Sequence, residues 1–226
     1  MTRTQVKICG LTRSADVERA VALGADAVGV VFAPSPRRLR PAAAARILDV
    51  VPITVARVGV FADEPTEFVL DAVAECRLDW VQLAGPGDPR TPAFLHARIL
   101  KTVHVTGASD LASAARGVAD AFLLDAPPAA GQRGGTGRSF DWAGAGRLPW
   151  PRHRVVVAGG LRPGNVGRAM AMLRPGAVDV SSGVESSPGI KDAELLAAFF
   201  AAVTRGDQAL HSEQREDDVD AGPFRR

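Results

Sequence analysis

Two residues that could transfer protons, Cys9 and Asp125, each stand at the end of a short apolar run. The thiol of Cys9 has an ordinary pKa of about 8.5, so a modest downward shift would make it a workable general base. Lys7 lies two residues earlier on the same strand face, where its charge could favour the thiolate. Asp125 follows four apolar residues and precedes a glycine-rich segment, so desolvation should raise its carboxyl pKa and suit it to donate a proton.

Each of these residues also has an ordinary structural interpretation. A free cysteine is often a small buried core residue, and we expect this role for Cys76, which falls late in a helical pattern. A carboxylate at the end of a strand often caps a helix or anchors a loop through a salt bridge. The residue pattern alone therefore leaves both alternatives open for Cys9 and Asp125.

Glycine-bearing turns after two later apolar runs indicate where an anion could bind. Gly159 and Gly160 follow one run, and Ser182 and Gly183 follow the next. Backbone N–H groups can approach phosphate oxygens closely at such glycines, although tight-turn geometry alone would also select them.

A pair of arginines, Arg37 and Arg38, follows the second apolar run by a few residues. A guanidinium at this position could bind a carboxylate through two parallel hydrogen bonds. The alternative is that both side chains simply face solvent.

Short valine-rich runs alternate with alanine-rich amphipathic stretches along the chain. Continuous apolar runs are typical of parallel strands that are buried on both faces. We expect strands at residues 5–9, 27–32, 55–61, 80–83, 99–104, 121–125, 154–158 and 178–181. We expect helices at residues 14–23, where Ser14 would be the N-cap, and at 41–50, 65–76, 92–98, 109–116, 142–146, 164–173 and 192–204.

Eight strand–helix units in just over 200 residues predict an α/β fold, a single (β/α)8 TIM barrel whose active site would lie at the carboxyl ends of the strands. An open doubly wound sheet is the alternative, but residues 9–12 lack the glycine-rich dinucleotide fingerprint. We assign residues 1–205 to the barrel domain. Residues 206–226 are polar and patternless, so we expect a disordered C-terminal tail there.

The composition argues against several classes of function. The formal net charge is only +2 in 226 residues, so electrostatics does not indicate nucleic acid or a membrane surface as a partner. The two cysteines cannot form a disulfide framework, and the first residues lack the apolar core of a signal peptide. No apolar stretch approaches the ~20 residues that a membrane span needs. We therefore expect a cytoplasmic protein.

Familiar metal and cofactor motifs are missing from the sequence. The four histidines and two cysteines have no ligand spacing, and there is no phosphate-binding Walker loop or nucleophile elbow. Acid–base chemistry on a phosphorylated small molecule, with neither metal nor cofactor, is the hypothesis that remains.

Several segments resemble the phosphoribosylanthranilate isomerase family of tryptophan biosynthesis. The matches begin with residues 7–12 (KICGLT), continue through residues 134–142 (GGTGRSFDW) and end near residues 178–185 (VDVSSGVE). Together, and in order, they span about residues 5–203. The resemblance implies a (β/α)8 barrel that performs an Amadori rearrangement, an aldose–ketose isomerisation without a cofactor, as a monomer or a homodimer.

The resemblance also implies roles for the matching residues. Asp125 would be the general acid that protonates the furanose ring oxygen, and Cys9 would be the general base that removes the C2 proton. Arg38 would lie near the anthranilate carboxylate, and residues 134–137 would form a mobile loop that closes over the substrate. The phosphate-binding residues would be Gly159, Gly160, Ser182 and Gly183. The substrate-binding residues would be Lys7, Arg38, Gln82, Gly135, Thr136 and Asp179.

One position departs from the family pattern. The family usually has Gln-Leu-His-Gly where this chain has Ala84 in place of the histidine. Two alternatives therefore stay open: a non-catalytic or specialised-pathway phosphosugar-binding protein, and a dual isomerase that also accepts the histidine-pathway aldose. Enzymes of the histidine pathway have an aspartate at the end of the first strand, so Cys9 argues against the second alternative.

Overall fold

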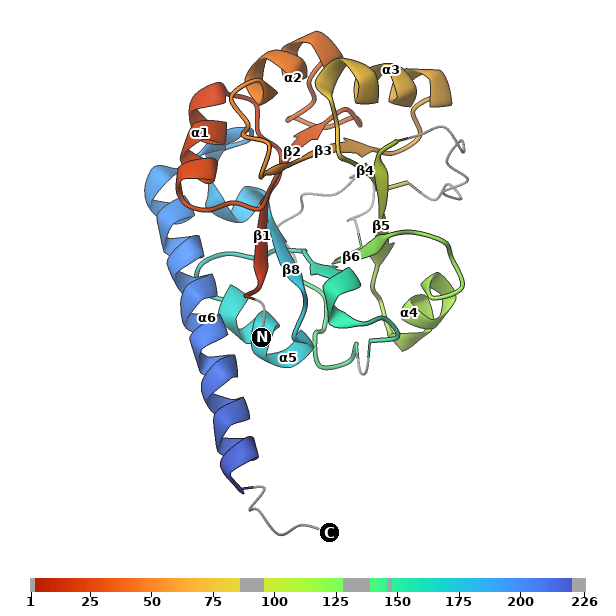
Figure 1. Ribbon diagram of the computed structural model, residues 1–226. Helices are drawn as coiled ribbons and strands as arrows, with labels where there is room; N and C mark the ends of the chain where they lie inside the picture. Colours follow the sequence, from red (N-terminus) through yellow and green to blue (C-terminus); the bar gives the residue numbers. More distant parts are fainter. Residues whose placement is uncertain (1–2, 86–95, 128–138, 146–147, 221–226) are drawn as a thin grey trace.

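The computed structural model describes residues 3–85, 96–127, 139–145 and 148–220, with side chains up to residue 212. Within them, eight parallel strands close into a barrel in the order β1 to β8 (Figure 1). The strands are β1 (Gln5–Ile8), β2 (Ala27–Val31), β3 (Ala56–Phe61), β4 (Trp80–Leu83), β5 (Arg98–His104), β6 (Ala121–Asp125), β7 (Val155–Val157) and β8 (Ala177–Val180). The predicted TIM-barrel fold is confirmed.

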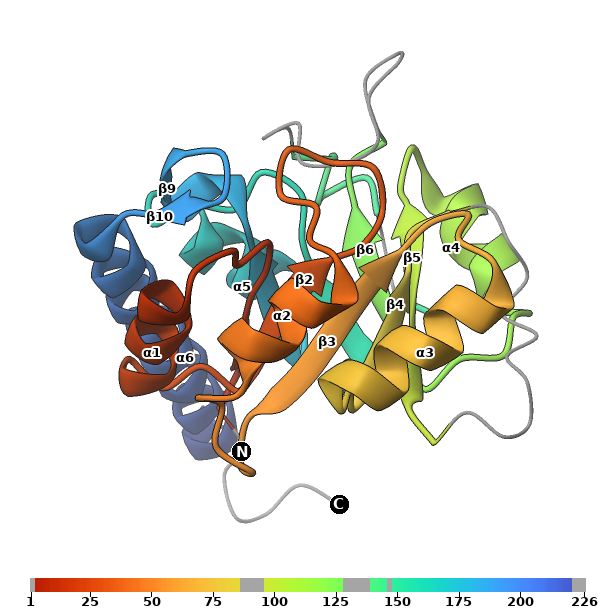
Figure 2. The same ribbon diagram turned by 90° about the horizontal axis from the view of Figure 1, so that it is seen from above.

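Helices cover the outside of the barrel in both ribbon views (Figures 1 and 2). They are α1 (Ser14–Ala22), α2 (Pro41–Leu48), α3 (Thr66–Cys76), α4 (Ala108–Ala114), α5 (Val166–Leu173) and α6 (Ala193–Asp220), with the short 3-10 helices η1 (Arg152–Arg154) and η2 (Ser182–Val184). In the part of the chain that the structure describes, no helix is long and apolar enough to cross a membrane.

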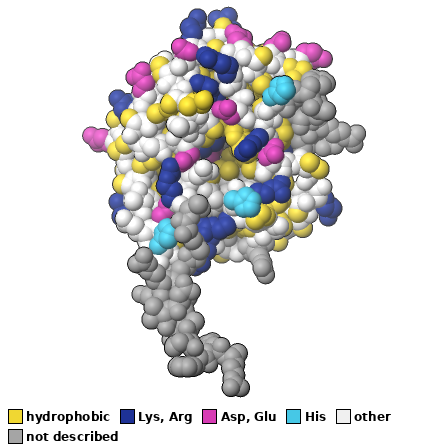
Figure 3. Space-filling view, viewed as in Figure 1, with side chains coloured by type: hydrophobic (Ala, Val, Ile, Leu, Met, Phe, Trp, Pro, Cys, Tyr) yellow, Lys and Arg dark blue, Asp and Glu magenta, His cyan; other side chains and the backbone are white. Residues whose placement is uncertain are grey.

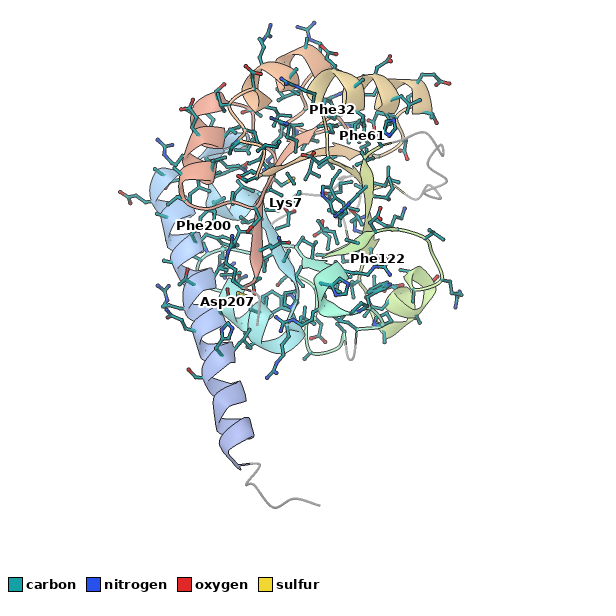
Figure 4. The ribbon with its side chains drawn as sticks, viewed as in Figure 1. Lys7, Phe32, Phe61, Phe122, Phe200 and Asp207 are labelled. Atoms are coloured by element: carbon teal, nitrogen blue, oxygen red, sulfur yellow. The ribbon has the colours of Figure 1, made fainter. Side chains whose placement is uncertain are left out.

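The strands are buried because the barrel interior packs against one face and the helices against the other. Val28 and Val30 of β2 are fully buried, as a continuous valine-rich run predicts. At the ends of β2 and β3, the rings of Phe32 and Phe61 stack with centroids 4.9 Å apart (Figure 4). On the face shown in Figure 3, basic and acidic side chains are interspersed, in keeping with the nearly balanced charge.

An antiparallel hairpin, β9 (Glu185–Ser187) and β10 (Ile190–Lys191), follows β8 and η2. Figure 2 shows the hairpin at the end of the barrel opposite the N terminus. All barrel strands run in the same direction, so this end gathers the residues that follow every strand. The site is therefore expected beside this hairpin.

The predicted boundary at residue 205 does not match a structural boundary. Helix α6 continues through Gly206 to Asp220. At Gly206 the helix packs closely against α5, since a Cβ there would lie 2.9 Å from Cε of Met170. Beyond it, Leu210 is buried, and the Asp207 carboxylate accepts hydrogen bonds from the Thr4 backbone N–H and hydroxyl (Figure 4). Residues 206–220, where we expected a disordered tail, thus continue α6 in the structure, and residues 221–226 lie outside the described part.

Two predicted helices and one predicted cap also need correction. Residues 142–145 form turns, since this glycine-containing stretch is too short to propagate a helix. The helix expected at 92–98 falls partly outside the described residues, and Arg98 already begins β5. Ser14 is the first residue of α1, and Arg13 occupies the cap position without a side-chain capping bond.

Candidate active site

A pocket of about 610 Å³ opens at the carboxyl ends of the barrel strands. Most of the predicted site residues contribute to its lining. They are Cys9, Gln82, Asp125, Gly159, Gly160, Asp179, Ser182 and Gly183. The thiol and the carboxyl group, although far apart in the sequence, therefore share one cavity.

Cys9 directly follows β1, and its backbone N–H donates to the Val180 carbonyl at 2.9 Å. Gly29 makes room for it, because a Cβ at Gly29 would lie only 3.1 Å from the Cys9 Sγ and 3.3 Å from the Lys7 Cε. Burial raises the pKa of the Cys9 thiol above its ordinary value, while the positive charges of Lys7 and Lys191 act in the opposite direction. The thiol is therefore the main form at neutral pH, with two cations able to stabilise the thiolate when it forms.

Lys7 and Asp179 form a buried ion pair beneath the pocket. The Lys7 Nζ donates to the Asp179 Oδ1 at 2.8 Å, and both side chains are less than a tenth exposed. Figure 4 shows Lys7 within the ring of strands. Burial alone would lower the pKa of Lys7, but Asp179 and Cys9 raise it above its ordinary value. Lys7 is thus a fixed cation next to the thiol, and it lies outside the residues that line the pocket.

A second buried cluster, which we call the Arg37 cluster, comprises Arg37, Glu185 and Lys191. The Arg37 guanidinium donates to both Glu185 carboxylate oxygens, at 2.8 and 2.6 Å. The Lys191 Nζ donates to Glu185 Oε1 at 2.7 Å and to the Ser181 carbonyl at 3.1 Å. Gly10 (φ +73°) leaves space for the arginine, because a Cβ there would lie 2.5 Å from Arg37 Cδ. Two cations share one anion, so the cluster keeps one net positive charge beside Cys9.

Asp125 is the last residue of β6, which β7 and β8 separate from β1, and it is partly buried in the pocket. Its Oδ1 accepts the Ala126 backbone N–H at 2.7 Å. Burial raises the pKa of the Asp125 carboxyl to about 6, although the charge of protonated His104 and the Ala126 N–H act to lower it. A carboxyl group with this pKa keeps a substantial protonated fraction near neutrality, as a general acid requires.

The ends of β7 and β8 provide the glycine turns that were predicted to bind phosphate. Gly159 and Gly160 have φ values of +78° and +60°, which L side chains rarely adopt. At Gly183, a Cβ would lie 1.8 Å from the Leu161 carbonyl oxygen, so no side chain fits. Together with Ser182, these residues present backbone to the pocket, which is the arrangement by which barrels bind phosphate.

Apolar and small side chains line the wall formed by β2, β3 and β4. The side chains are Val31, Ala33, Val60, Ala62 and Ala84, and they pack together with Cys9. Gln82 lies next to this wall, and its Nε2 donates to the Thr102 hydroxyl at 3.3 Å. Such a wall accommodates a flat apolar group, and Ala84 leaves it wider than a histidine would.

The structure separates the two neighbouring arginines. Arg37 is buried and lines the pocket, whereas Arg38, predicted to bind a carboxylate, is exposed and is absent from the pocket lining. Arg37 is held at the pocket by its ion pair with Glu185, whereas the Arg38 side chain has no such contact in the described residues and is exposed. Gly135 and Thr136, also predicted to bind substrate, lie outside the described residues.

Three functional candidates were not predicted. Glu185 and Lys191 reach the site through the β9–β10 hairpin, for which the sequence gives no periodic signal. His104 lines the pocket as the last residue of β5. The rule that strand ends supply the site would have found it, had it been applied to the run at residues 99–104. Over the described ranges, no group of His, Cys, Asp and Glu side chains could hold a metal ion.

Comparisons with known proteins agree with this geometry. Residues 6–202 match the family model described as "N-(5'phosphoribosyl)anthranilate (PRA) isomerase". An N-(5'-phosphoribosyl)anthranilate isomerase of Geobacter sp. (strain M21) is 46% identical over 199 residues, which cover 88% of this chain and 97% of that protein.

Solved structures give the same result. The phosphoribosyl anthranilate isomerase of Thermus thermophilus superposes with a TM-score of 0.78 at 39% identity, covering 89% of this chain and 99% of that one. Another isomerase, solved in complex with reduced 1-(o-carboxyphenylamino)-1-deoxyribulose 5-phosphate, has a TM-score of 0.73 at 37% identity, with the same coverage. The chain therefore belongs to the N-(5'-phosphoribosyl)anthranilate isomerase family.

Proposed function

We propose that this chain isomerises N-(5-phosphoribosyl)anthranilate to 1-(2-carboxyphenylamino)-1-deoxyribulose 5-phosphate, with Asp125 as general acid and Cys9 as general base. The observation that carries the proposal is that the carboxyl and the thiol line one pocket, whose other walls suit a phosphate and an aryl ring. The family membership supports the same reaction, and the ligand named for one solved relative is a reduced form of this product.

In the first step, protonated Asp125 donates its proton to the furanose ring oxygen. The bond from that oxygen to C1 breaks, the arylamine nitrogen supplies the electron pair, and the sugar opens to a protonated Schiff base. A pKa of about 6 makes the Asp125 carboxyl a stronger acid than water and still partly protonated near neutrality.

In the second step, the Cys9 thiolate removes the proton from C2, and the electron pair moves into the Schiff base to give an enolamine. The enolamine then becomes the ketose as C1 gains a proton and the C2 hydroxyl loses one. The thiol can return its proton to C1, and Asp125 can accept the hydroxyl proton, so both groups regain their starting states. Lys7 and the Arg37 cluster support the transient thiolate electrostatically.

The substrate orientation follows from the walls of the pocket. The phosphate would lie at Gly159, Gly160, Ser182 and Gly183, and the aryl ring at the apolar wall. Gln82 and Asp179 line the same pocket and would contact the sugar, and Lys7 would act through its pair with Asp179. Gly135 and Thr136 are assigned to substrate binding by the family resemblance.

The aryl carboxylate is the substrate group that needs a cation. Arg37 lines the pocket in a cluster with one net positive charge, while Arg38 is exposed, so Arg37 is the better placed of the two. Substituting Arg38 by Ala should then change KM little, whereas Arg37→Lys should raise KM. A larger increase in KM for Arg38→Ala would restore the role first predicted for Arg38.

The proposed function is tested by following the fluorescence of freshly generated phosphoribosylanthranilate with the purified chain. We expect consumption that saturates with substrate, and a ketose product that binds in calorimetry. Tight product binding without any turnover would overturn the proposed reaction in favour of a non-catalytic phosphosugar-binding protein. Consumption of the histidine-pathway aldose in the same assay would instead indicate a dual isomerase.

A further inference from the structure

His104 ends β5 next to the proposed general acid. In the register of the β5–β6 pair, His104 is the partner of Asp125, and each is the last residue of its strand. Residues in register on neighbouring parallel strands have side chains on the same face of the sheet. Both side chains accordingly line the pocket.

Both side chains also contact the backbone of the same residue, Ala126. The Asp125 Oδ1 accepts the Ala126 N–H at 2.7 Å, and the His104 Nδ1 lies 3.3 Å from the Ala126 carbonyl oxygen. A carbonyl oxygen can only accept, so this contact requires a hydrogen on Nδ1. The contact therefore selects the ring form in which Nδ1 carries a hydrogen.

We propose that His104 is a positioning residue for Asp125: its imidazole binds the carbonyl of Ala126, the residue whose N–H binds the carboxylate, and its ring lies in register beside the acid. The proposal rests on the proposed function, since it assigns His104 to the same reaction. His104 would act through Asp125 and need not touch the substrate.

The charge contributed by His104 has a definite direction. When its imidazole is protonated, it favours the ionised Asp125 and lowers the pKa of that carboxyl against the effect of burial. The other charged groups that act on Asp125 are Asp179 on β8, which raises its pKa, and Lys7 on β1, which lowers it. Lys101 and Asp63 line the same pocket, and they are left unchanged in every variant used below.

Two substitutions separate the hydrogen bond from the charge. In His104→Asn, the amide can still donate to the Ala126 carbonyl but cannot be protonated near neutrality. In His104→Ala, both the donor and the charge are lost. His153→Asn serves as the matched control, because His153 lies on η1, which precedes β7, and not at the carboxyl end of any strand.

The readouts are an NMR titration of the Asp125 carboxyl carbon in 13C-labelled protein, assigned by its loss in Asp125→Asn, and kcat and KM at a pH where Asp125 is protonated in all variants. We expect the Asp125 midpoint to rise by roughly half a pH unit in both His104 variants and to stay in place in His153→Asn. We expect kcat to fall about 3- to 10-fold in His104→Ala, with KM within about twofold, and to recover in His104→Asn.

The proposal is overturned if the Asp125 carboxyl has the wild-type titration midpoint in both His104 variants, or if His104→Ala keeps the wild-type kcat. It is also overturned if His104→Asn is as impaired as His104→Ala, because the retained donor should restore the position of Ala126. The NMR titration needs no turnover, so a chain without isomerase activity would refute the proposed function while the coupling of His104 to Asp125 is still measured.

Discussion

The Cys9 side of the pocket and the Asp125 side differ in how their charges are compensated. Around Cys9, the Lys7–Asp179 pair and the Arg37 cluster bring together five buried, hydrogen-bonded charged groups. They come from β1, β8, the loop between β2 and α2, and the β9–β10 hairpin. Asp125 accepts one backbone N–H, and its nearest titratable neighbour is His104. The base is thus surrounded by paired charges, whereas the acid has no ion-pair partner among the described residues.

This difference follows from the opposite chemical tasks of the two groups. A base must become negative during the reaction, and fixed cations beside it stabilise that state. An acid must keep a protonated fraction near neutrality, and burial without an ion-pair partner provides this by raising the pKa of the carboxyl. The same burial should make Asp125 a source of instability at neutral pH, whereas the charges around Cys9 should stabilise the fold.

The largest effect is expected on the Cys9 side. Cys9→Ala removes the base, so kcat should fall by about 10²- to 10⁴-fold while the protein remains folded. The measurement is the steady-state rate of phosphoribosylanthranilate consumption. Cys76→Ala is the matched control, because Cys76 is also a buried thiol but lies on α3, away from the pocket lining. Equal rates for the two variants would refute the role of Cys9.

Glu185→Gln should strongly destabilise the fold, because it leaves Arg37 and Lys191 buried without their anion. We expect the free energy of unfolding in urea at pH 7 to fall by about 3–5 kcal/mol. In the native state, burial alone would raise the pKa of Glu185, but Arg37 and Lys191 lower it. The stability that Glu185 contributes is therefore present above its unfolded pKa of about 4.3 and should disappear as the pH falls below it.

Asp49→Asn is the matched comparison for the stability change in Glu185→Gln. The pair of Asp49 with Arg77 has the same kind of contact, at 2.9 Å, but both side chains are about 70% exposed. We expect its loss to change the free energy of unfolding by less than about 1 kcal/mol. If the two substitutions were equally mild, the Arg37 cluster would not stabilise the Cys9 side as described.

Asp125→Asn should have the opposite effect on stability. The pKa of Asp125 is about 6 in the folded protein and about 3.9 in an unfolded chain, so the native state loses stability as the pH rises from 4 to 6. Replacing the carboxyl with a neutral amide should raise the free energy of unfolding at pH 7 by about 1–3 kcal/mol. Urea unfolding at pH 4 is the internal control, since the gain should vanish there; a gain of the same size at both pH values would contradict this explanation.

A smaller effect is expected where α6 anchors the start of β1, on the Cys9 side. Asp207→Ala removes the acceptor for the Thr4 N–H and hydroxyl, so thermal or urea unfolding should show a loss of about 1–2 kcal/mol. The contact lies at the barrel end opposite the pocket, so kcat should stay within about twofold of the wild type. A large fall in kcat would show that the Cys9 side depends on this anchor for its geometry.

Much of the fold could be predicted from local patterns. Short apolar runs predicted all eight strands, because strands buried on both faces require largely apolar sequence. The end of α6 could not be predicted in this way. Gly206 resembles a helix stop in the sequence, and only its packing against Met170 explains why the helix continues.

The site was predictable where strand ends determine it, and not where distant segments meet. The rule placed Cys9 and Asp125 in one pocket. It could not decide between Arg37 and Arg38, because the ion pair with Glu185, a residue far along the chain, is what holds Arg37 at the pocket. Nor could it find the Arg37 cluster, since Glu185 and Lys191 reach Arg37 only through the tertiary position of the hairpin.

The most direct test of the central claim is the turnover of Asp125→Asn beside the wild type at pH 7, with substrate generated in the cuvette. Our account predicts that the wild type isomerises phosphoribosylanthranilate, and that the variant, though more stable, is slower by about 10²-fold or more. Wild-type turnover by the variant would contradict it, because the partly protonated carboxyl would then have no part in opening the sugar ring.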